Sequence, residues 1–126
     1  MLQKEGAGWR LAWDPSRSKY PFLVGGEGWA FELTDNEWKI FVELVLDLLK
    51  EHEQIKKQLM TDEKISLEIE RQFCWGCLDG DQNQWSLQIL WYSEKFDLRA
   101  MEFSWPSPIA MEVVHSMRIL RDSCQF

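Results

Sequence analysis

The longest hydrophobic pattern in the chain runs from Thr34 to about Met60. Apolar residues recur there at steps of three and four, which predicts one amphipathic helix. The segment Thr34-Asp35-Asn36-Glu37 reads as a capping box at its start. Residues 38–49 are apolar around most of the helix, whereas residues 50–57 are largely charged. We therefore expect the first half to lie on a broad apolar surface. The apolar positions of the stripe are Trp38, Phe41, Val42, Val45, Leu48, Leu49, Ile55 and Leu59.

Segments on both sides of this helix alternate apolar and polar residues with a period of two, the pattern of half-buried strands. Asp79-Gly80-Asp81 is a turn signal between two of them. A second helix is predicted over residues 107–121, with Ser107 as its N-cap and Pro108 at the first helical position. The predicted strands cover residues 9–13, 20–24, 29–33, 65–73, 85–91 and 101–105, with one more possible between 73 and 85.

This order of elements predicts a single α+β domain over residues 1–126. Short links between the strands favour a curved antiparallel sheet of six to seven strands, with two helices on one face. The order also suggests that a strand-strand-strand-helix unit is used twice. The predicted core consists of Trp38, Phe41, Val45, Leu48, Leu67, Ile69, Leu87 and Ile89.

Composition indicates a soluble globular chain, since 126 residues with 45% hydrophobic content can bury a real core. No apolar run approaches the roughly 20 residues of a membrane span, and the first residues lack a signal-peptide pattern. An odd number of cysteines, three, fits a reducing compartment. We expect a cytoplasmic protein without a membrane partner. The net charge of −7 argues against strong binding to nucleic acid.

Cys74-Trp75-Gly76-Cys77 has the spacing of a redox pair. Redox cysteines of this kind lower their thiol pKa at a helix N-terminus. Here the motif ends a strand pattern and leads toward a turn, so two strand cysteines used as small hydrophobic residues are the favoured interpretation. In an extended chain the two side chains would point to opposite faces.

Other sequence features that could hold a metal, a cofactor or a catalytic site have simpler structural interpretations. Gly25-Gly26-Glu27-Gly28 joins strand to strand and carries an acid, so a hairpin turn is favoured over a phosphate loop. Cys124, His52 and His115 have no zinc-finger spacing. Glu68 and Glu70 on one strand face read as a solvated face. We therefore predict no cofactor, no metal and no enzymatic activity.

Aromatic and basic residues are interleaved near the N-terminus, the one region with more cations than acids. Such a surface could stack bases and neutralise phosphates of a single strand. The alternative is that the tryptophans face the helices and the cations only border the sheet. The candidate nucleic-acid patch consists of Trp9, Arg10, Trp13, Arg17, Lys19 and Tyr20.

The charged end of the long helix offers a different surface, on which acids could meet a basic protein partner. Its candidate residues are Glu51, Glu53, Asp62 and Glu63. Eight tryptophans and open sheet edges also favour self-association. A small-molecule pocket is a further class that the sequence leaves open.

Three Trp-rich segments resemble a small cyanobacterial family that is known only as a domain of unknown function. They are GWRLAWDPSR at 8–17, GGEGWAFELT at 25–34 and FSWPSPI at 103–109. The resemblance implies the fold of single-stranded-DNA-binding transcriptional regulators such as plant Whirly proteins, with two strand-rich units each closed by a helix. The lysine-rich strand motif of Whirly proteins has no counterpart here, so the resemblance assigns no binding residue.

Taken together, these features predict a non-catalytic binding or assembly module that acts through protein contact or self-association. The alternative is weak binding of single-stranded nucleic acid.

Overall fold

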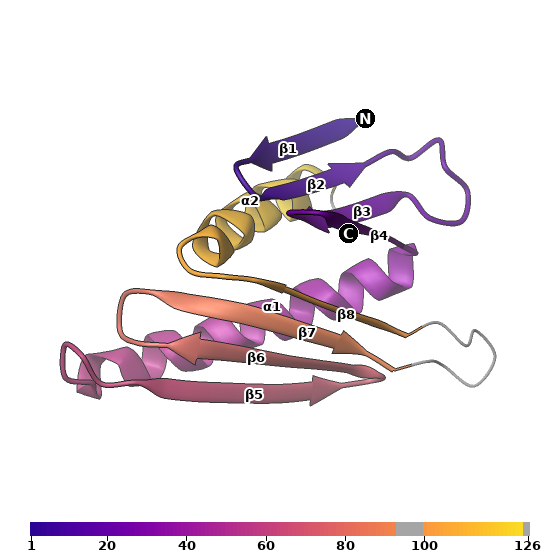
Figure 1. The fold of residues 1–126 in the computed structure, drawn as a ribbon. Coiled ribbons are helices and arrows are strands. Elements are labelled where there is room, and N and C mark those ends of the chain that lie inside the picture. Colours follow the sequence, from indigo (N-terminus) through magenta and orange to yellow (C-terminus); the bar gives the residue numbers. More distant parts are fainter. Residues whose placement is uncertain (93–99, 125–126) are drawn as a thin grey trace.

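The structure is a computed structural model, and it describes residues 1–92 and 100–124. In this part of the chain, eight strands form two four-stranded antiparallel sheets, and a helix follows each sheet (Figure 1). The α+β class with two helices is therefore confirmed. The elements are β1 (Leu2–Gly6), β2 (Trp9–Trp13), β3 (Phe22–Gly26), β4 (Trp29–Leu33), α1 (Asp35–Ile55), the 3-10 helix η1 (Lys56–Gln58), β5 (Ile65–Arg71), β6 (Cys74–Gly80), β7 (Trp85–Trp91), β8 (Met101–Trp105) and α2 (Ile109–Cys124).

The prediction of one continuous sheet is wrong. Strands pair in chain order within each sheet, β1 to β4 and β5 to β8. The hairpin argument applies only to strands that short turns connect, whereas the 21 residues of α1 separate β4 from β5. The repeated unit has four strands rather than three. The pattern missed β1 because four of its five residues are exposed and its sequence, LQKEG, contains one large apolar side chain.

The two helices do not cover one face of one sheet, as the sequence had predicted. Helix α1 packs mainly on β5 and β6 of the second sheet, and α2 packs on β2 of the first sheet and β7 of the second. Figure 1 shows α1 running behind the second sheet and α2 behind the first. The side of the second sheet away from the helices carries mostly polar residues, among them Glu68, Gln88 and Glu102, which explains the alternation in that part of the sequence.

Aromatic side chains join the two sheets. The Trp29 ring of β4 lies 5.1 Å from the Phe103 ring of β8 and 5.4 Å from the Trp105 ring, measured between centroids. The indole Nε1–H of Trp105 donates to the carbonyl oxygen of Gly25 in β3 at 3.0 Å. Phe41 of α1 packs edge-on against Phe103. Several tryptophans thus form the core rather than a recognition surface.

The capping box at the start of α1 is confirmed. The Glu37 N–H donates to the Thr34 hydroxyl at 3.1 Å, and the Thr34 N–H donates to the Glu37 carboxylate at 2.8 Å. The helix ends at Ile55 rather than near Met60, and η1 follows. None of the η1 residues is buried, so no apolar contact holds this last segment in α-helical form.

Other boundaries shift by a few residues. The strand predicted at 20–24 is β3, Phe22–Gly26. Helix α2 begins at Ile109, because residues 107 and 108 form a turn in which the Ala110 N–H donates to the Pro106 carbonyl. Ser107 is therefore not the N-cap. The predicted turn begins later than expected, since Asp79 and Gly80 are the last residues of β6.

The predicted core is confirmed for seven of its eight residues, and Leu67 is only half-buried. Its strand, β5, lies at the edge of the second sheet and has a neighbour on one side only. The predicted end of the strand over residues 65–73 is wrong as well, because β5 ends at Arg71, before Phe73. Phe73 lies in the β5–β6 turn with φ of 69° and is 45% exposed.

Candidate functional site: a basic cleft beside helix α1

A cleft with a volume of about 890 Å³ lies beside the C-terminal half of α1. One stripe of this helix forms a wall, because positions 46, 49, 50, 53 and 54 recur at helical spacing, and Lys57 of η1 extends this wall. The lining residues are Leu46, Leu49, Lys50, His52, Glu53, Gln54, Lys56, Lys57, Gln82, Asn83, Trp85 and Arg118.

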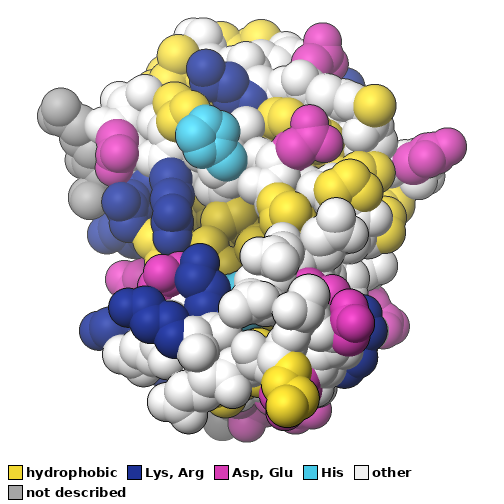
Figure 2. All heavy atoms as spheres, turned by 90° about the vertical axis from the view of Figure 1, so that its left-hand side faces the viewer, with side chains coloured by type: hydrophobic (Ala, Val, Ile, Leu, Met, Phe, Trp, Pro, Cys, Tyr) yellow, Lys and Arg dark blue, Asp and Glu magenta, His cyan; other side chains and the backbone are white. Residues whose placement is uncertain are grey.

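The other walls come from distant parts of the sequence. Arg118 belongs to α2, and Gln82 and Asn83 belong to the turn between β6 and β7. Figure 2 faces this side of the molecule and shows dark-blue Lys and Arg side chains bordering a hollow with hydrophobic side chains at its floor. The apolar residues of the lining are Leu46, Leu49 and Trp85.

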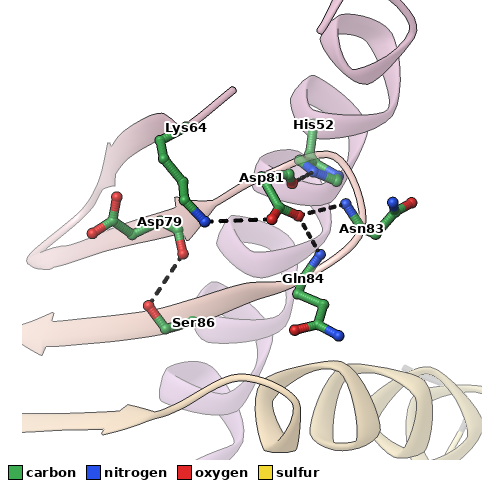
Figure 3. A network of polar contacts seen from close by, with 7 residues as sticks. All are labelled: His52, Lys64, Asp79, Asp81, Asn83, Gln84 and Ser86. Carbon is green, nitrogen blue, oxygen red and sulfur yellow. Dashed lines mark hydrogen bonds and ion pairs between the residues drawn. The ribbon is translucent and has the colours of Figure 1, made fainter. Parts of the chain in front are cut away.

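Asp81 fixes the shape of the β6–β7 turn (Figure 3). Its carboxylate oxygen Oδ1 accepts the backbone N–H groups of Asn83 and Gln84, both at 2.8 Å. The Asp81 N–H in turn donates to the Gln84 carbonyl at 2.8 Å. The bonds from these N–H groups hold the pKa of the Asp81 carboxyl below its ordinary value, because they favour its ionised form. A local side chain thus determines the backbone that carries Gln82 and Asn83.

Two further hydrogen bonds tie this turn to the end of α1. His52 Nε2 lies 2.9 Å from the carbonyl oxygen of Asp81, and the Gln82 side-chain amide donates to the Lys56 carbonyl at 3.2 Å. A carbonyl oxygen can only accept, so Nε2 of His52 carries the hydrogen. The His52 ring is buried and lies edge-on to Trp85, 6.1 Å between centroids. The histidine therefore has a structural role.

The cleft is positively charged within an acidic chain. Lys50, Lys56, Lys57 and Arg118 line it, against one acid, Glu53. Lys56 forms an ion pair with Glu53 at 3.0 Å. Among the described residues, no hydrogen bond or ion pair joins the side chains of Lys50, Lys57 or Arg118 to another group. Three cations are thus available to a ligand.

These groups can hold an anion and contact an apolar part of the same ligand. Lysine and arginine side chains bind phosphate or carboxylate through charge-assisted hydrogen bonds. No nucleophile is paired with a base in the lining, and the Nε2–H of His52 is already bonded to Asp81. The arrangement is suited to binding.

Among the described residues, no group of three or more His, Cys, Asp or Glu side chains could hold a metal ion. Cys74 and Cys77 both lie in β6 as free thiols, three residues apart on an extended strand. Cys74 belongs to the hydrophobic core, and the Cys77 sulfur lies 3.4 Å from the Ser66 hydroxyl. Burial raises the pKa of the Cys74 thiol to about 12.

The residues of the candidate nucleic-acid patch lie on different sides of the first sheet. Trp9 is buried in the core, and Trp13 is half-buried with its ring stacked on Phe22. Arg10 follows Trp9 in β2 and is exposed on the opposite face. Nucleic-acid binding there stays a prediction.

The other members of the patch lie in the loop between β2 and β3. Arg17 pairs with Glu32 at 2.7 Å, and the Lys19 ammonium lies 5.3 Å from the ring centroid of the half-buried Tyr20. Arg17 therefore already has an acidic partner.

The acidic residues predicted as a protein-contact face lie around the end of α1. Glu53 lines the cleft and pairs with Lys56, and the Glu63 carboxylate accepts the Met60 N–H at 3.1 Å. Glu51 and Asp62 are exposed. Protein contact through these four residues stays a prediction.

The sequence interpretation missed the cleft because it counted charges along the chain. Lys50, Lys56 and Lys57 lie in a segment with more acids than cations. Helical spacing could have separated these cations from the nearby acids. In a continuous helix, Lys50 and Lys57 are seven residues apart and share a face, whereas Glu51 lies on a different face. Arg118 could not be joined to them without the tertiary structure.

Comparison with known proteins identifies the family. A family model described as a domain of unknown function, DUF1818, matches residues 4–120. The chain belongs to the DUF1818 family. No curated protein matches the chain. A crystal structure at 1.80 Å of a protein with unknown function, described as of the DUF155 family and from Prochlorococcus sp. NATL2A, is similar to it at 42% sequence identity. The similarity covers 95% of this chain and 98% of that one, with a TM-score of 0.89.

These matches confirm the expected family of unknown function and show a structural neighbour of unknown function from a cyanobacterium. In the described residues of this DUF1818 chain, no helix has the length and hydropathy needed to cross a membrane.

Proposed function

We propose that this DUF1818 chain is a non-catalytic binding module and that the basic cleft takes a small anionic ligand. The observation that carries the proposal is the position of Lys50, Lys57 and Arg118. They come from two separate parts of the fold, border one cleft, and have no ion pair among the described residues.

The size of the cleft supports a small ligand. A volume of about 890 Å³ lies within the range of roughly 300–1,000 Å³ in which proteins bind metabolites and cofactors. The turn at Asp81 and its bonds to α1 form part of the wall before any ligand arrives, so binding requires little ordering of the backbone.

The charge distribution supports a compact anion over a long polyanion. The chain as a whole carries −7, so a nucleic-acid strand that extends beyond the cleft would meet repulsion. Screening limits such interactions to about 8 Å at physiological salt. A ligand confined to the cleft is therefore influenced mostly by the nearby cations.

The absence of catalysis is supported by the lining, where His52 is held by Asp81 and no activated nucleophile is present. Self-association and the Whirly-like fold stay predictions, and weak binding of a single strand is the alternative that the test below separates.

Isothermal titration with pyrophosphate at low salt tests the proposal. The double variant Lys57→Gln/Arg118→Gln should lose at least about tenfold in affinity, because two charge-assisted contacts are removed. The matched control is Lys4→Gln/Lys39→Gln, which removes two exposed lysines outside the cleft and outside the candidate nucleic-acid patch. Equal affinity in both variants, or no binding to the unchanged protein, would contradict the proposal. Tighter binding of a single-stranded oligonucleotide would favour the alternative.

A further inference from the structure

We infer that the ligand of the cleft is a nucleotide, with its phosphates on the lysine and arginine side chains and its ring over the apolar floor beside Asn83. This inference rests on the proposed function and adds the chemical class of the ligand. Three features of the lining carry it: the spread of the cations, the apolar floor, and the side-chain amides of the turn.

The cations extend over a distance that suits more than one phosphate. Lys50 lies in α1 and Lys57 lies seven residues further on, in η1, so about two helical turns separate the two lysines along the chain. Lys56 lies beside Lys57, and Arg118 adds a planar donor group from α2. Arginine can bind phosphate through two parallel hydrogen bonds, and lysine binds it as a point charge. A single monovalent carboxylate would leave most of these cations unused.

The floor provides a surface for an apolar, flat group. Leu46 and Leu49 are half-buried residues of α1, and Trp85, the first residue of β7, is 8% exposed. Because this apolar surface and the cations line the same cleft, a ligand that carries both a charged and an apolar part uses the whole cleft. Inorganic phosphate or pyrophosphate would contact only the charged part of it.

The side-chain amides of the β6–β7 turn favour a heterocyclic ring over an alkyl chain as the apolar part of the ligand. The Asn83 side-chain amide is exposed, has no partner among the described residues, and points away from Asp81 (Figure 3). Gln82 also lines the cleft; its side-chain N–H donates to the Lys56 carbonyl, and its side-chain oxygen can act as an acceptor. The edge of a nucleobase offers hydrogen-bond donors and acceptors to these side-chain amides. An alkyl chain would instead remove the amides from water without giving them a partner.

Titration of the full chain with three probes in metal-free buffer at low salt tests the inference. The probes are ADP, pyrophosphate and adenosine. We expect ADP to bind at least about tenfold more tightly than either part alone, because it uses both regions of the cleft. Asn83→Ala should weaken ADP by about three- to tenfold and leave pyrophosphate unchanged. This variant keeps the Asn83 N–H that bonds to Asp81, so the turn is preserved.

The outcomes separate the two proposals. If pyrophosphate binds in a manner that depends on Lys57 and Arg118 but ADP binds no better, the nucleotide inference is wrong and the proposed function stands. If ADP binds more tightly but Asn83→Ala has no effect on it, the placement of the ring is wrong. If none of the probes binds, the proposed function fails, and the nucleotide inference fails with it.

Discussion

His52 on α1 and Asp81 in the β6–β7 turn are 29 residues apart in the sequence, yet the imidazole Nε2 lies 2.9 Å from the Asp81 carbonyl oxygen. This bond joins the end of a helix to a hairpin turn, and the basic cleft lies where the two meet. The cleft thus depends on a contact between a buried side chain and a backbone group, which a pattern of charges does not reveal.

Replacement of His52 tests this link. His52→Phe keeps a ring beside Trp85 but removes the donor to Asp81, so we expect the free energy of unfolding to fall by about 1–3 kcal/mol. His115→Phe is the control, since His115 is exposed on α2 and should change stability by less than about 0.5 kcal/mol. Urea denaturation followed by circular dichroism measures both. Equal losses in the two variants would show that the bond does not stabilise the fold.

The core of α1 gives a second prediction. Phe41 is fully buried and contacts rings of β8, so Phe41→Ala should lower the free energy of unfolding by about 3–5 kcal/mol. Phe73→Ala removes the same ring from a position that is 45% exposed and should cost less than about 1 kcal/mol. Urea titrations of the two variants give the comparison. A loss below about 1 kcal/mol for Phe41→Ala would contradict the assignment of this helix face.

Local chemistry made some of these elements predictable from the sequence. The capping box at Thr34 and the apolar stripe of α1 depend on residues close to one another in the chain. The strand at Trp9–Trp13 follows from alternation alone. By contrast, β1 has too few apolar residues to show a pattern, and the division into two sheets depends on which strands meet after α1.

A repeated motif in the two hairpins of the first sheet also escaped the sequence interpretation. Gly6-Ala7-Gly8-Trp9 and Gly26-Glu27-Gly28-Trp29 share one arrangement. The last glycine of each has a positive φ, 82° at Gly8 and 81° at Gly28. A Cβ at the first glycine would lie 2.4 Å from the Nε1 atom of the tryptophan. The first glycine in each motif therefore leaves room for an indole ring across the hairpin.

This motif gives a third prediction. Gly26→Ala should displace the Trp29 ring from Phe103 and Trp105, and thereby change the near-ultraviolet circular dichroism and lower stability by about 1–3 kcal/mol. Gly28→Ala should lower stability through its positive φ but leave the near-ultraviolet spectrum unchanged, because no atom lies within 4 Å of its added Cβ. Identical spectra for both variants would show that Trp29 does not depend on Gly26.

Thiol chemistry gives a fourth prediction. Burial raises the pKa of Cys74 to about 12 and that of Cys124 to about 11. At pH 8 both thiols should react slowly with a disulfide reagent in the folded protein, Cys74 more slowly than Cys124, and rapidly in denaturant. Because the folded protein favours the neutral Cys74 thiol, its pKa is higher in the folded than in the unfolded state. The stability that the neutral thiol contributes is complete below the unfolded pKa of about 9 and is lost as the pH rises toward the folded pKa. Mass spectrometry of labelled peptides locates the modification. Rapid labelling of Cys74 in the folded state would contradict its burial.

The most direct test of the central claim is a map of amide chemical shifts in ¹H–¹⁵N spectra during titration with pyrophosphate. If the cleft is the binding site, the largest changes should fall on Lys57, Gln82, Asn83 and Arg118, which lie in three separate segments of the chain. Saturation of these changes at one dissociation constant would support a single site. Changes confined to residues 9–20, or no saturable change anywhere, would contradict the claim that the cleft binds an anion.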